Sequence, residues 1–304
     1  MTVTVIVPTF RRPEDLARCL ARLADQTRPP DQAIVVVRDI DTETAQLLDT
    51  DGAVPLVVDR VIVDVPGQVA ALNAGVDKAF GDIVAITDDD GAPHRDWLAH
   101  AEARFAADGT IGGVGGPDWL QGSTVDGSAD VTGRMQWFGR IDTRKEGVTD
   151  VDILKGCNMT YRRTAIGATR FDARLRGTGA QVFNDFAFSL TIRRKGWRLV
   201  SDPSVAVDHY QAQRSDEDQR ATFVAVAHSN ATHNRTLLTL DHLGPWRAPF
   251  YLAYALLIGS RPFPGVAAML RNVSQRQPRS VAYWWATVVG HVAGLRTYLR
   301  TSLR

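Results

Sequence analysis

The apolar run at residues 2–8, Thr-Val-Thr-Val-Ile-Val-Pro, is the feature that most constrains the fold of this chain. A strand with one face in water alternates apolar and polar residues, whereas this run carries β-branched apolar side chains on both faces. We therefore expect a strand that is covered on both sides, as in parallel sheets. Apolar residues then recur at helical spacing from Pro13 to Leu23, so a helix follows the strand.

The alternation of strand and helix continues over the first 90 residues. We expect helices at 43–49 and 68–79 and strands at 33–37, 54–58, 61–65 and 82–87. This order with short connections predicts an α/β fold with a mostly parallel sheet flanked by helices. Such sheets bind ligands at the carboxyl ends of their strands, which here are Pro8–Arg11, Arg38–Asp41 and Thr87–Asp90.

The rest of the chain shows weaker patterns. Residues 110–155 are rich in glycine and are expected to form irregular loops next to the site. Beyond them we expect a helix at 185–195, strands at 197–200 and 204–207, and helices at 217–241 and 280–302.

Composition excludes several classes of protein. The 304 residues fit two domains, and 44% apolar with 23% charged residues is typical of a globular protein. The net charge of +1 does not favour nucleic acid as a partner, and neither the dinucleotide-binding Gly-x-Gly-x-x-Gly after the first strand nor a P-loop is present. Cys19 and Cys157 are too few for a disulfide framework, and the N-terminus lacks a signal-peptide pattern, so we expect a cytoplasmic protein.

Charge divides the chain into two regions. Residues 211–304 contain eleven arginines, no lysine and four acidic residues, and no acidic residue follows Asp241. We expect a catalytic domain at 1–210 and a helical, Arg-rich extension at 211–304. The apolar run 250–259 is shorter than the roughly 20 residues that span a bilayer. Peripheral attachment to an anionic membrane surface, packing on the catalytic domain and a homodimer contact all remain open for the extension.

Three adjacent carboxylates, Asp88, Asp89 and Asp90, follow directly after the apolar strand at 83–86. Side by side they repel one another unless a cation or hydrogen-bond donors compensate. Oxygen ligands suit Mg²⁺ or Mn²⁺, which hold phosphates with one or two carboxylates. A solvated acidic turn is the alternative.

Several motifs in order resemble the family 2 glycosyltransferases over residues 1–210. They are Thr-Val-Ile-Val-Pro-Thr-Phe-Arg-Arg at 4–12, Gly67-Gln68 with Leu72-Asn73-Ala74-Gly75, Gly81–Asp90, Lys155-Gly156-Cys157-Asn158-Met159, Asn184-Asp185 and Arg194-Lys195-Gly196-Trp197. The resemblance implies a GT-A fold, with a nucleotide-binding half at 1–110 and an acceptor half at 111–210. It also implies a nucleotide-diphosphate sugar donor, a divalent metal (Mn²⁺ or Mg²⁺) and inversion at the anomeric carbon.

The resemblance also assigns roles to residues at the donor side of the site. Pro8, Thr9 and Arg11 would border the nucleobase, and Asp39 would accept a hydrogen bond from it, most commonly from uracil. The second strand ends in Arg38-Asp39 instead of the family's Asp-Asp or Asp-Asn, and a turn or helix-capping role is the alternative for Asp39. Asn73 is grouped with the donor-binding residues.

The resemblance implies that the acidic triplet and two later residues contact the metal and the sugar. Asp88 would contact ribose or sugar hydroxyls, Asp90 would hold the metal that bridges the phosphates, and Asp89 would share either role. His209 would be a further metal or diphosphate ligand, with a packed or exposed histidine as the alternative. Asn158 would contact the donor sugar, with structural packing as the alternative.

Asp185 occupies the position of the family's general base, the carboxylate that takes the proton of the acceptor hydroxyl. Asn184 replaces the usual Glu before it and so removes a charge that would raise the pKa of the base. An acidic residue in the first turn of a helix is the alternative for Asp185.

These assignments predict an inverting transferase that moves a sugar, from UDP in the commonest case, to a saccharide or lipid-linked acceptor in polysaccharide or glycolipid assembly. A catalytically weak nucleotide-sugar-binding protein is the alternative, because Asn184 departs from the family pattern. A nucleotidyltransferase is disfavoured, because the Gly-rich N-terminal loop that bears Arg and Lys is absent.

Overall fold

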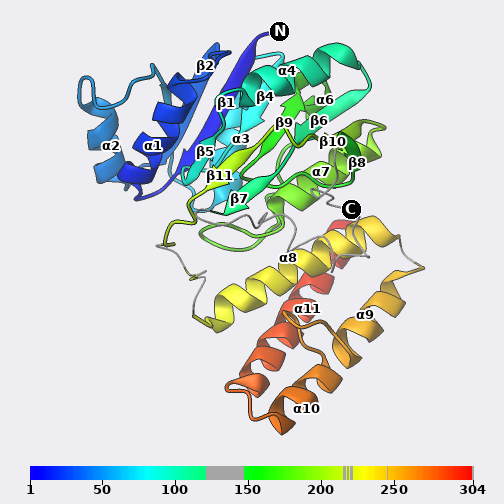
Figure 1. The fold of residues 1–304 in the computed structure, drawn as a ribbon. Coiled ribbons are helices and arrows are strands. Elements are labelled where there is room, and N and C mark those ends of the chain that lie inside the picture. Colours follow the sequence, from blue (N-terminus) through cyan, green and yellow to red (C-terminus); the bar gives the residue numbers. More distant parts are fainter. Residues whose placement is uncertain (121–146, 215–216, 218, 220–221, 245, 303–304) are drawn as a thin grey trace. The chain divides into compact units, whose positions relative to one another are not determined.

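The computed structural model describes the chain except for residues 121–146, 215–216, 218, 220–221, 245 and 303–304 (Figure 1). The chain forms two compact units. The first, unit 1, comprises residues 1–172 and 184–212, and the second, unit 2, comprises residues 173–183 and 213–304. Each unit is described by itself.

Unit 1 is a layered α/β structure. Its elements in chain order are β1 (Val3–Thr9), α1 (Pro13–Ala24), β2 (Gln32–Arg38), α2 (Thr42–Asp49), β3 (Asp59–Val63), α3 (Gln68–Lys78), β4 (Ile83–Ile86), β5 (Gly91–Pro93), α4 (Trp97–Ala107), β6 (Ile111–Gly115), β7 (Asp118–Leu120), β8 (Thr149–Val151), β9 (Met159–Arg162), α6 (Arg163–Ile166), α7 (Asn184–Arg194), β10 (Arg198–Ser201) and β11 (Val207–His209).

Eight of the described strands form one sheet in the order β3-β2-β1-β4-β9-β6-β10-β8. Neighbours pair in parallel from β3 to β4 and between β6 and β10, whereas β9 and β8 run antiparallel to their neighbours. The expected α/β fold with a mostly parallel sheet is therefore confirmed.

Strand β1 is buried on both faces, as its composition predicts. Val3, Val5 and Val7 point into a core that contains the apolar faces of α1 and α4. On the other face, Ile6 contacts α3 so closely that a Cβ on Gly75 would lie 2.5 Å from an Ile6 methyl group. Helices thus cover both faces of β1. Its last residue, Thr9, lies where the parallel strands of the sheet have their carboxyl ends.

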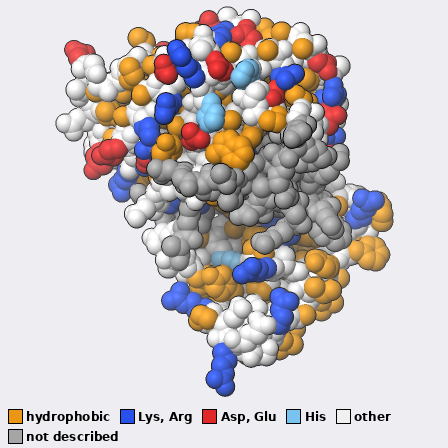
Figure 2. All heavy atoms as spheres, in the orientation of Figure 1, with side chains coloured by type: hydrophobic (Ala, Val, Ile, Leu, Met, Phe, Trp, Pro, Cys, Tyr) orange, Lys and Arg blue, Asp and Glu red, His pale blue; other side chains and the backbone are white. Residues whose placement is uncertain are grey.

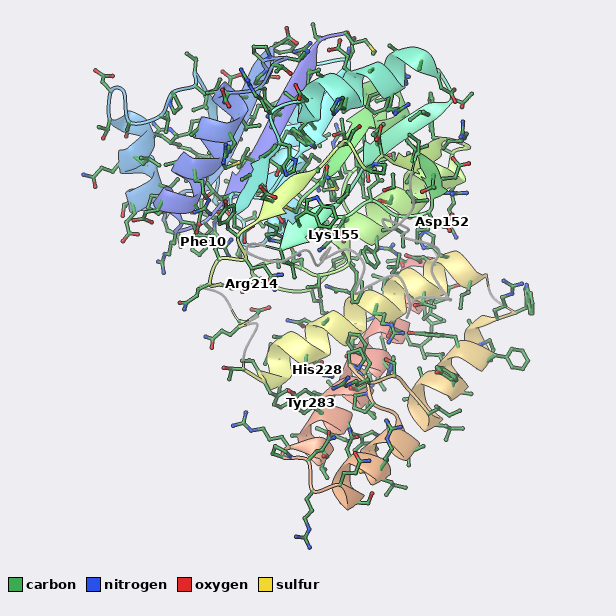
Figure 3. The ribbon with its side chains drawn as sticks, in the orientation of Figure 1. Phe10, Asp152, Lys155, Arg214, His228 and Tyr283 are labelled. Atoms are coloured by element: carbon green, nitrogen blue, oxygen red, sulfur yellow. The ribbon has the colours of Figure 1, made fainter. Side chains whose placement is uncertain are left out.

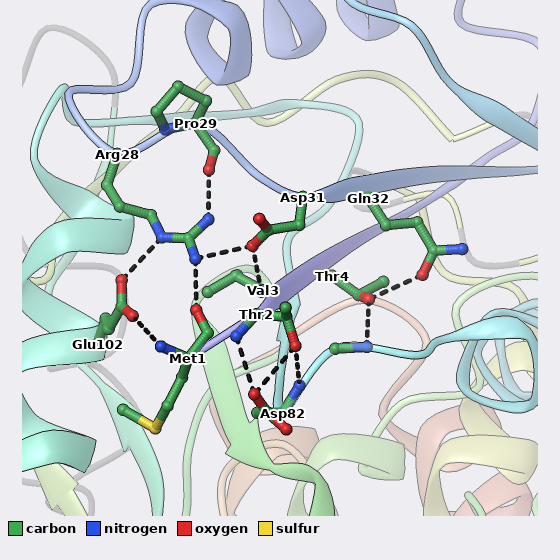
Figure 4. Close-up of polar contacts among 11 residues, drawn as sticks. Met1, Thr2, Val3, Thr4, Arg28, Pro29, Asp31, Gln32, Asp82 and Glu102 are labelled. Carbon is green, nitrogen blue, oxygen red and sulfur yellow. Dashed lines mark hydrogen bonds and ion pairs between the residues drawn. The ribbon is translucent and has the colours of Figure 1, made fainter.

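Polar side chains hold the beginning of β1 (Figure 4). Asp31 accepts a hydrogen bond from the Val3 amide at 2.7 Å, and Asp82 accepts one from the Thr2 amide at 2.9 Å. Because the amide and hydroxyl of Thr2 both donate to Asp82, the pKa of this carboxyl lies below its ordinary value. Residues just before β2 and β4 therefore set the register of the central strand.

A second, smaller sheet contains β5, β11 and β7 in that order. His209 pairs with Gly91 of the antiparallel β5, and Val207 pairs with Asp118 of the parallel β7. This pairing brings the chain after β4, the start of β7 and the end of β11 together.

The strand expected at 54–58 is wrong, because these residues form a loop and the edge strand is β3, Asp59–Val63.

The irregular segment expected at 110–155 is also wrong in its described part, which contains β6, β7 and β8; residues 121–146 lie outside the described residues. Strand β6 reads as a loop because of its glycines. Yet a Cβ on Gly112 or Gly113 would lie within 3 Å of the side chain of Trp197 or Leu199, so glycine is required for packing there.

Unit 2 is helical over most of its described residues. Its helices are α8 (Ala225–Leu243), α9 (Ala248–Leu257), α10 (Val266–Ser274) and α11 (Ser280–Ser302). The helix expected to begin at residue 217 begins at Ala225, because Val224 has an extended backbone. Gly290 of α11 allows a close approach to α8, since a Cβ there would lie 2.4 Å from Thr232 Cβ. His228 of α8 and Tyr283 of α11 also meet, with ring centroids 5.3 Å apart (Figure 3).

Among the described helices, none combines the length and apolar character that a membrane crossing requires.

Candidate functional site

The three carboxylates after β4 occupy different environments. Asp89 is buried, and its oxygens accept hydrogen bonds from Thr9 Oγ1 at 2.8 Å and from Arg12 at 2.9 Å. Burial nevertheless raises the pKa of Asp89 to about 7, against the opposing effect of Arg12. The end of β1 and the start of α1 thus supply the partners of this carboxyl.

Asp90 is held by the end of β11 and the residues after it. Its Oδ2 accepts a hydrogen bond from the Ala212 amide at 2.9 Å, and its Oδ1 lies 3.2 Å from His209 Nε2. Burial raises the pKa of Asp90, but His209, the Ala212 amide and Arg12 together outweigh this effect, so the pKa is lowered. Asp90 is therefore ionised at neutral pH.

His209 is fixed from its other ring nitrogen. Nδ1 lies 2.9 Å from Asp118 Oδ1, and the second oxygen of Asp118 pairs with Lys155 Nζ. Asp118 has 0% exposure. Burial lowers the pKa of His209, but the Asp118 and Asp90 carboxylates outweigh it and raise the pKa to about 9. Figure 3 labels Lys155 beside the small sheet.

These residues fit a divalent cation. One donor atom each from Asp88, Cys157 and His209 lies within 4.8 Å of the others, and Asp90 adjoins the same histidine. His209 Nε2 is buried without an interaction that meets hydrogen-bond geometry, and Asp118 holds the opposite nitrogen. A histidine oriented in this way by a carboxylate is a frequent metal ligand. The carboxylate oxygens suit the Mn²⁺ or Mg²⁺ expected here, with Asp90 and His209 as first candidates and Asp88 beside them.

Asp185 lies in the first turn of α7, and its carboxylate faces the turn before β9. Its Oδ2 accepts a hydrogen bond from the Gly156 amide at 2.9 Å, and its Oδ1 accepts one from the Phe186 amide at 2.9 Å. Burial outweighs both amides and the nearby Lys155, and it raises the pKa of Asp185 to about 6. Such a carboxylate is ionised near neutral pH and still binds a proton readily, as a general base must.

A glutamine connects the acidic triplet to this helix. Gln68, the first residue of α3, donates to Asp88 Oδ1 at 3.0 Å and accepts from Asn184 Nδ2 at 3.2 Å. Asn184 therefore takes part in orienting Asp88 through Gln68. A glutamate at position 184 would need a proton to donate to the same Gln68 oxygen.

Two of the residues expected to bind the donor form hydrogen bonds within the protein. Asn158 is 1% exposed; it accepts from Trp97 Nε1 at 2.9 Å and donates to the Pro117 and Val205 carbonyls at 3.1 and 2.7 Å. Both amide protons are used, so its side chain has no donor left for a sugar. Asn73 likewise forms two hydrogen bonds with the backbone of Phe171, at 3.0 and 2.7 Å.

Among the residues expected at the nucleobase, Pro8 is buried in β1 and Thr9 donates to Asp89. Arg11 is exposed with a φ of 56°, and its guanidinium lies 5.1 Å from the centre of the Phe10 ring. Asp39 has a side chain 44% exposed, 3.6 Å from Arg38. The carboxylate that caps α2 is Asp41, through the Thr44 amide at 3.1 Å, whereas Asp39 lies in the turn between β2 and α2.

Sequence reasoning did not single out four residues that contact the site's carboxylates or His209. Arg12, Gln68 and Lys155 lie within the motifs quoted above, so their polar character next to assigned residues was an available signal. Asp118 had no local signal, because its contact with His209 depends on the pairing of β7 with β11.

A protein-family model described as "Glycosyltransferase like family 2" matches residues 1–227. The chain belongs to this glycosyltransferase family. Its first unit accordingly has the GT-A fold that the motifs imply.

Known glycosyltransferases resemble the chain in sequence and in structure. The glycosyltransferase AglE of Haloferax volcanii is 27% identical over 173 residues, which are 54% of this chain and 53% of AglE, so the match spans about half of each protein. The mannosyltransferase PcManGT from Pyrobaculum calidifontis, solved with GDP-Man and Mn²⁺, has a TM-score of 0.58 and 20% identity, over 98% of this chain and 86% of PcManGT. A fragment of S. aureus TarS with UDP-GlcNAc has a TM-score of 0.54 and 17% identity, over 99% and 92% of the two chains.

Replacement of Asn158 tests its structural role in this glycosyltransferase. In Asn158→Ala the Trp97 N–H and two buried carbonyls lose their partner, at a cost of roughly 1–3 kcal/mol for each buried group left unsatisfied. We expect urea unfolding to show a stability loss of at least about 2 kcal/mol, and the half-exposed Asn272→Ala to change little. Unchanged stability together with weaker donor binding would instead make Asn158 a donor ligand.

Proposed function

We propose that the chain is an inverting glycosyltransferase that transfers a sugar from a nucleotide-diphosphate donor, a UDP-sugar in the first instance, to a hydroxyl group. The acceptor is a saccharide or a lipid-linked saccharide in polysaccharide or glycolipid assembly. One observation carries this proposal: a buried cluster of carboxylates with His209 and a separate, proton-binding carboxylate, Asp185, occur in the same unit. Transfer needs both groups: the cluster with its cation for the departing diphosphate, and Asp185 for the proton of the acceptor.

Asp90 and His209 would hold the divalent cation, with Asp88 beside them. When bound, Mn²⁺ or Mg²⁺ supplies positive charge to the departing diphosphate. The protein's own contribution is to keep these ligands in place without the cation. Asp118 and Lys155 orient His209, Arg12 and Thr9 donate hydrogen bonds to Asp89, and Gln68 donates one to Asp88.

Asp185 would take the proton of the acceptor hydroxyl as its oxygen attacks the anomeric carbon. The amides of Gly156 and Phe186 bond to its two oxygens, which orients the carboxylate. Gly156 also suits the close approach of a substrate, because the nearest described atom to a Cβ added there is Asp185 Oδ2, at 3.6 Å. Attack opposite the leaving diphosphate inverts the anomeric carbon.

The nucleobase would lie against the exposed residues after β1 and β2, where Arg11 and Asp39 offer a cation and an acceptor. Asp39 would accept a base N–H, which uracil provides. Turnover with UDP-sugars and GDP-sugars side by side identifies the base.

Replacement of Asp185 tests its role as the general base. Asp185→Asn keeps the shape of the side chain and removes the proton acceptor, so transfer should fall by about 100-fold or more. Donor binding, measured by calorimetry, should stay within about threefold. In the wild type, kcat/KM should rise with pH through about 6 and then level off, because only the ionised Asp185 takes a proton.

The control is Asp39→Asn, which should weaken nucleotide binding and leave the pH profile of kcat/KM unchanged. If Asp185→Asn transfers sugar as fast as wild type, the base lies elsewhere. If no donor is turned over although nucleotide sugars bind, the protein is a nucleotide-sugar-binding protein and the transferase proposal is wrong.

For residues 211–304 we propose attachment to an anionic membrane surface at the cytoplasmic side. Large apolar side chains are exposed on the helices of unit 2 and beside them, including Trp246, Phe250 and Trp285 at 60–70% exposure. Exposed arginines accompany them, and Figure 2 shows apolar and basic side chains together on this unit. Apolar insertion combined with attraction to anionic lipid is a common mode of peripheral binding.

Vesicle co-sedimentation tests this attachment. The full chain should bind vesicles with anionic lipid, and high salt should weaken binding through screening. Replacing exposed Arg271, Arg276 and Arg279 with Gln should lower binding by about 100-fold, at roughly 1 kcal/mol for each basic residue near the surface. Equal binding to neutral vesicles would indicate apolar insertion alone, and no binding to either would favour the intramolecular or homodimer role.

A further inference from the structure

A cysteine thiol lies among the oxygen and nitrogen donors of the site. Cys157 is 2% exposed in the turn before β9, where the Asn158 amide bonds to the Lys155 carbonyl at 2.8 Å. Its Sγ, an oxygen of Asp88 and a nitrogen of His209 lie within 4.8 Å of one another. A Cβ on Gly91 would lie 3.1 Å from Sγ, so the glycine after the acidic triplet leaves room for the sulfur.

A second observation identifies the cluster as a ligand site. His209 Nδ1 is held by Asp118, and the buried Nε2 lies 3.2 Å from Asp90 Oδ1. Because Asp118 fixes the ring, Nε2 is the nitrogen that faces the other donors, and a cation bound there would replace the Nε2 proton beside Asp90.

The three donors favour a different class of cation from the one that transfer requires. Mg²⁺ and Mn²⁺ prefer oxygen ligands, whereas a thiolate, an imidazole and a carboxylate together suit Zn²⁺. Three protein ligands and one open position are the usual set at catalytic zinc sites.

We propose that Cys157, Asp88 and His209 form a binding site for a thiophilic divalent cation, with Zn²⁺ as the physiological example, that competes with Mn²⁺ or Mg²⁺. In the binding step a metal–sulfur bond and a metal–nitrogen bond form, the Cys157 S–H bond and the His209 Nε2–H bond break, and both protons pass to the solvent. His209 binds the cation through Nε2 and keeps its Nδ1 bond to Asp118. Only the competition with Mn²⁺ or Mg²⁺ rests on the proposed function. Binding of the thiophilic cation itself needs no sugar or nucleotide.

Cobalt(II) spectroscopy on the untagged, metal-free full chain tests this site, since Co²⁺ bound to a thiolate shows a sulfur-to-metal charge-transfer band. The band should appear in the wild type and in Cys19→Ser, the matched control for the other buried cysteine. It should be absent in Cys157→Ser, whose Zn²⁺ affinity should be at least about 100-fold weaker. Loss of an outer-shell partner alone costs about 10–100-fold.

Two further measurements keep the result interpretable. Circular dichroism and melting of Cys157→Ser establish that the variant is folded, and electron paramagnetic resonance follows displacement of bound Mn²⁺ by Zn²⁺ in the wild type. A charge-transfer band that persists in Cys157→Ser, a band lost in Cys19→Ser, or no band in the wild type would each overturn the proposal. None of these outcomes bears on sugar transfer, which fails separately if no donor is turned over.

Discussion

The burial of Asp89 and Asp90 beside the half-buried Asp88, at the end of β4, is the constraint on which the rest of unit 1 depends. Carboxylates in a low-dielectric setting repel one another and bind protons, unless other segments deliver donors and cations to them. Thr9 at the end of β1 and Arg12 just before α1 donate hydrogen bonds to Asp89. Gln68 of α3 donates one to Asp88, and His209 of β11 pairs with Asp90. The protein compensates the triplet only in part, since the pKa of Asp89 stays raised by burial to about 7. A divalent cation would supply the missing positive charge.

The small sheet of β5, β11 and β7 connects the acidic triplet to the residues around Asp185. Asp118 at the start of β7 contacts His209 through one oxygen and Lys155 through the other, and Lys155 precedes Gly156, whose amide holds Asp185. A continuous set of contacts therefore leads from the acidic triplet to the proposed base. Asp118 is fully buried, and its carboxylate raises the pKa of both Lys155 and His209.

An element or a site residue can be predicted from the sequence when the residues that determine its structure lie within or next to it in the chain. Strands β1, β2 and β4 are continuous apolar runs, and the carboxylates after β4 stand out by residue type and position, so both were accessible to sequence reasoning. Strand β6 was not, because its glycines resemble a loop until Trp197 and Leu199 pack against them. Asn158 looked like a sugar ligand, since nothing in its neighbourhood reveals that Trp97, Pro117 and Val205 converge on it. The roles given to Asp90, His209 and Asp185 stay predictions that agree with their placement.

Calorimetric titration of UDP into the full chain, with Mn²⁺ and with chelator, tests the central claim most directly. The claim is that the acidic triplet and His209 form a diphosphate site only when a divalent cation neutralises them. The account predicts that Mn²⁺ tightens UDP binding at least about 10-fold, equivalent to roughly 1.4 kcal/mol. It also predicts that Asp90→Ala removes this difference, because Asp90 adjoins His209 at 3.2 Å. Equal UDP affinity with and without Mn²⁺ in the wild type would contradict it.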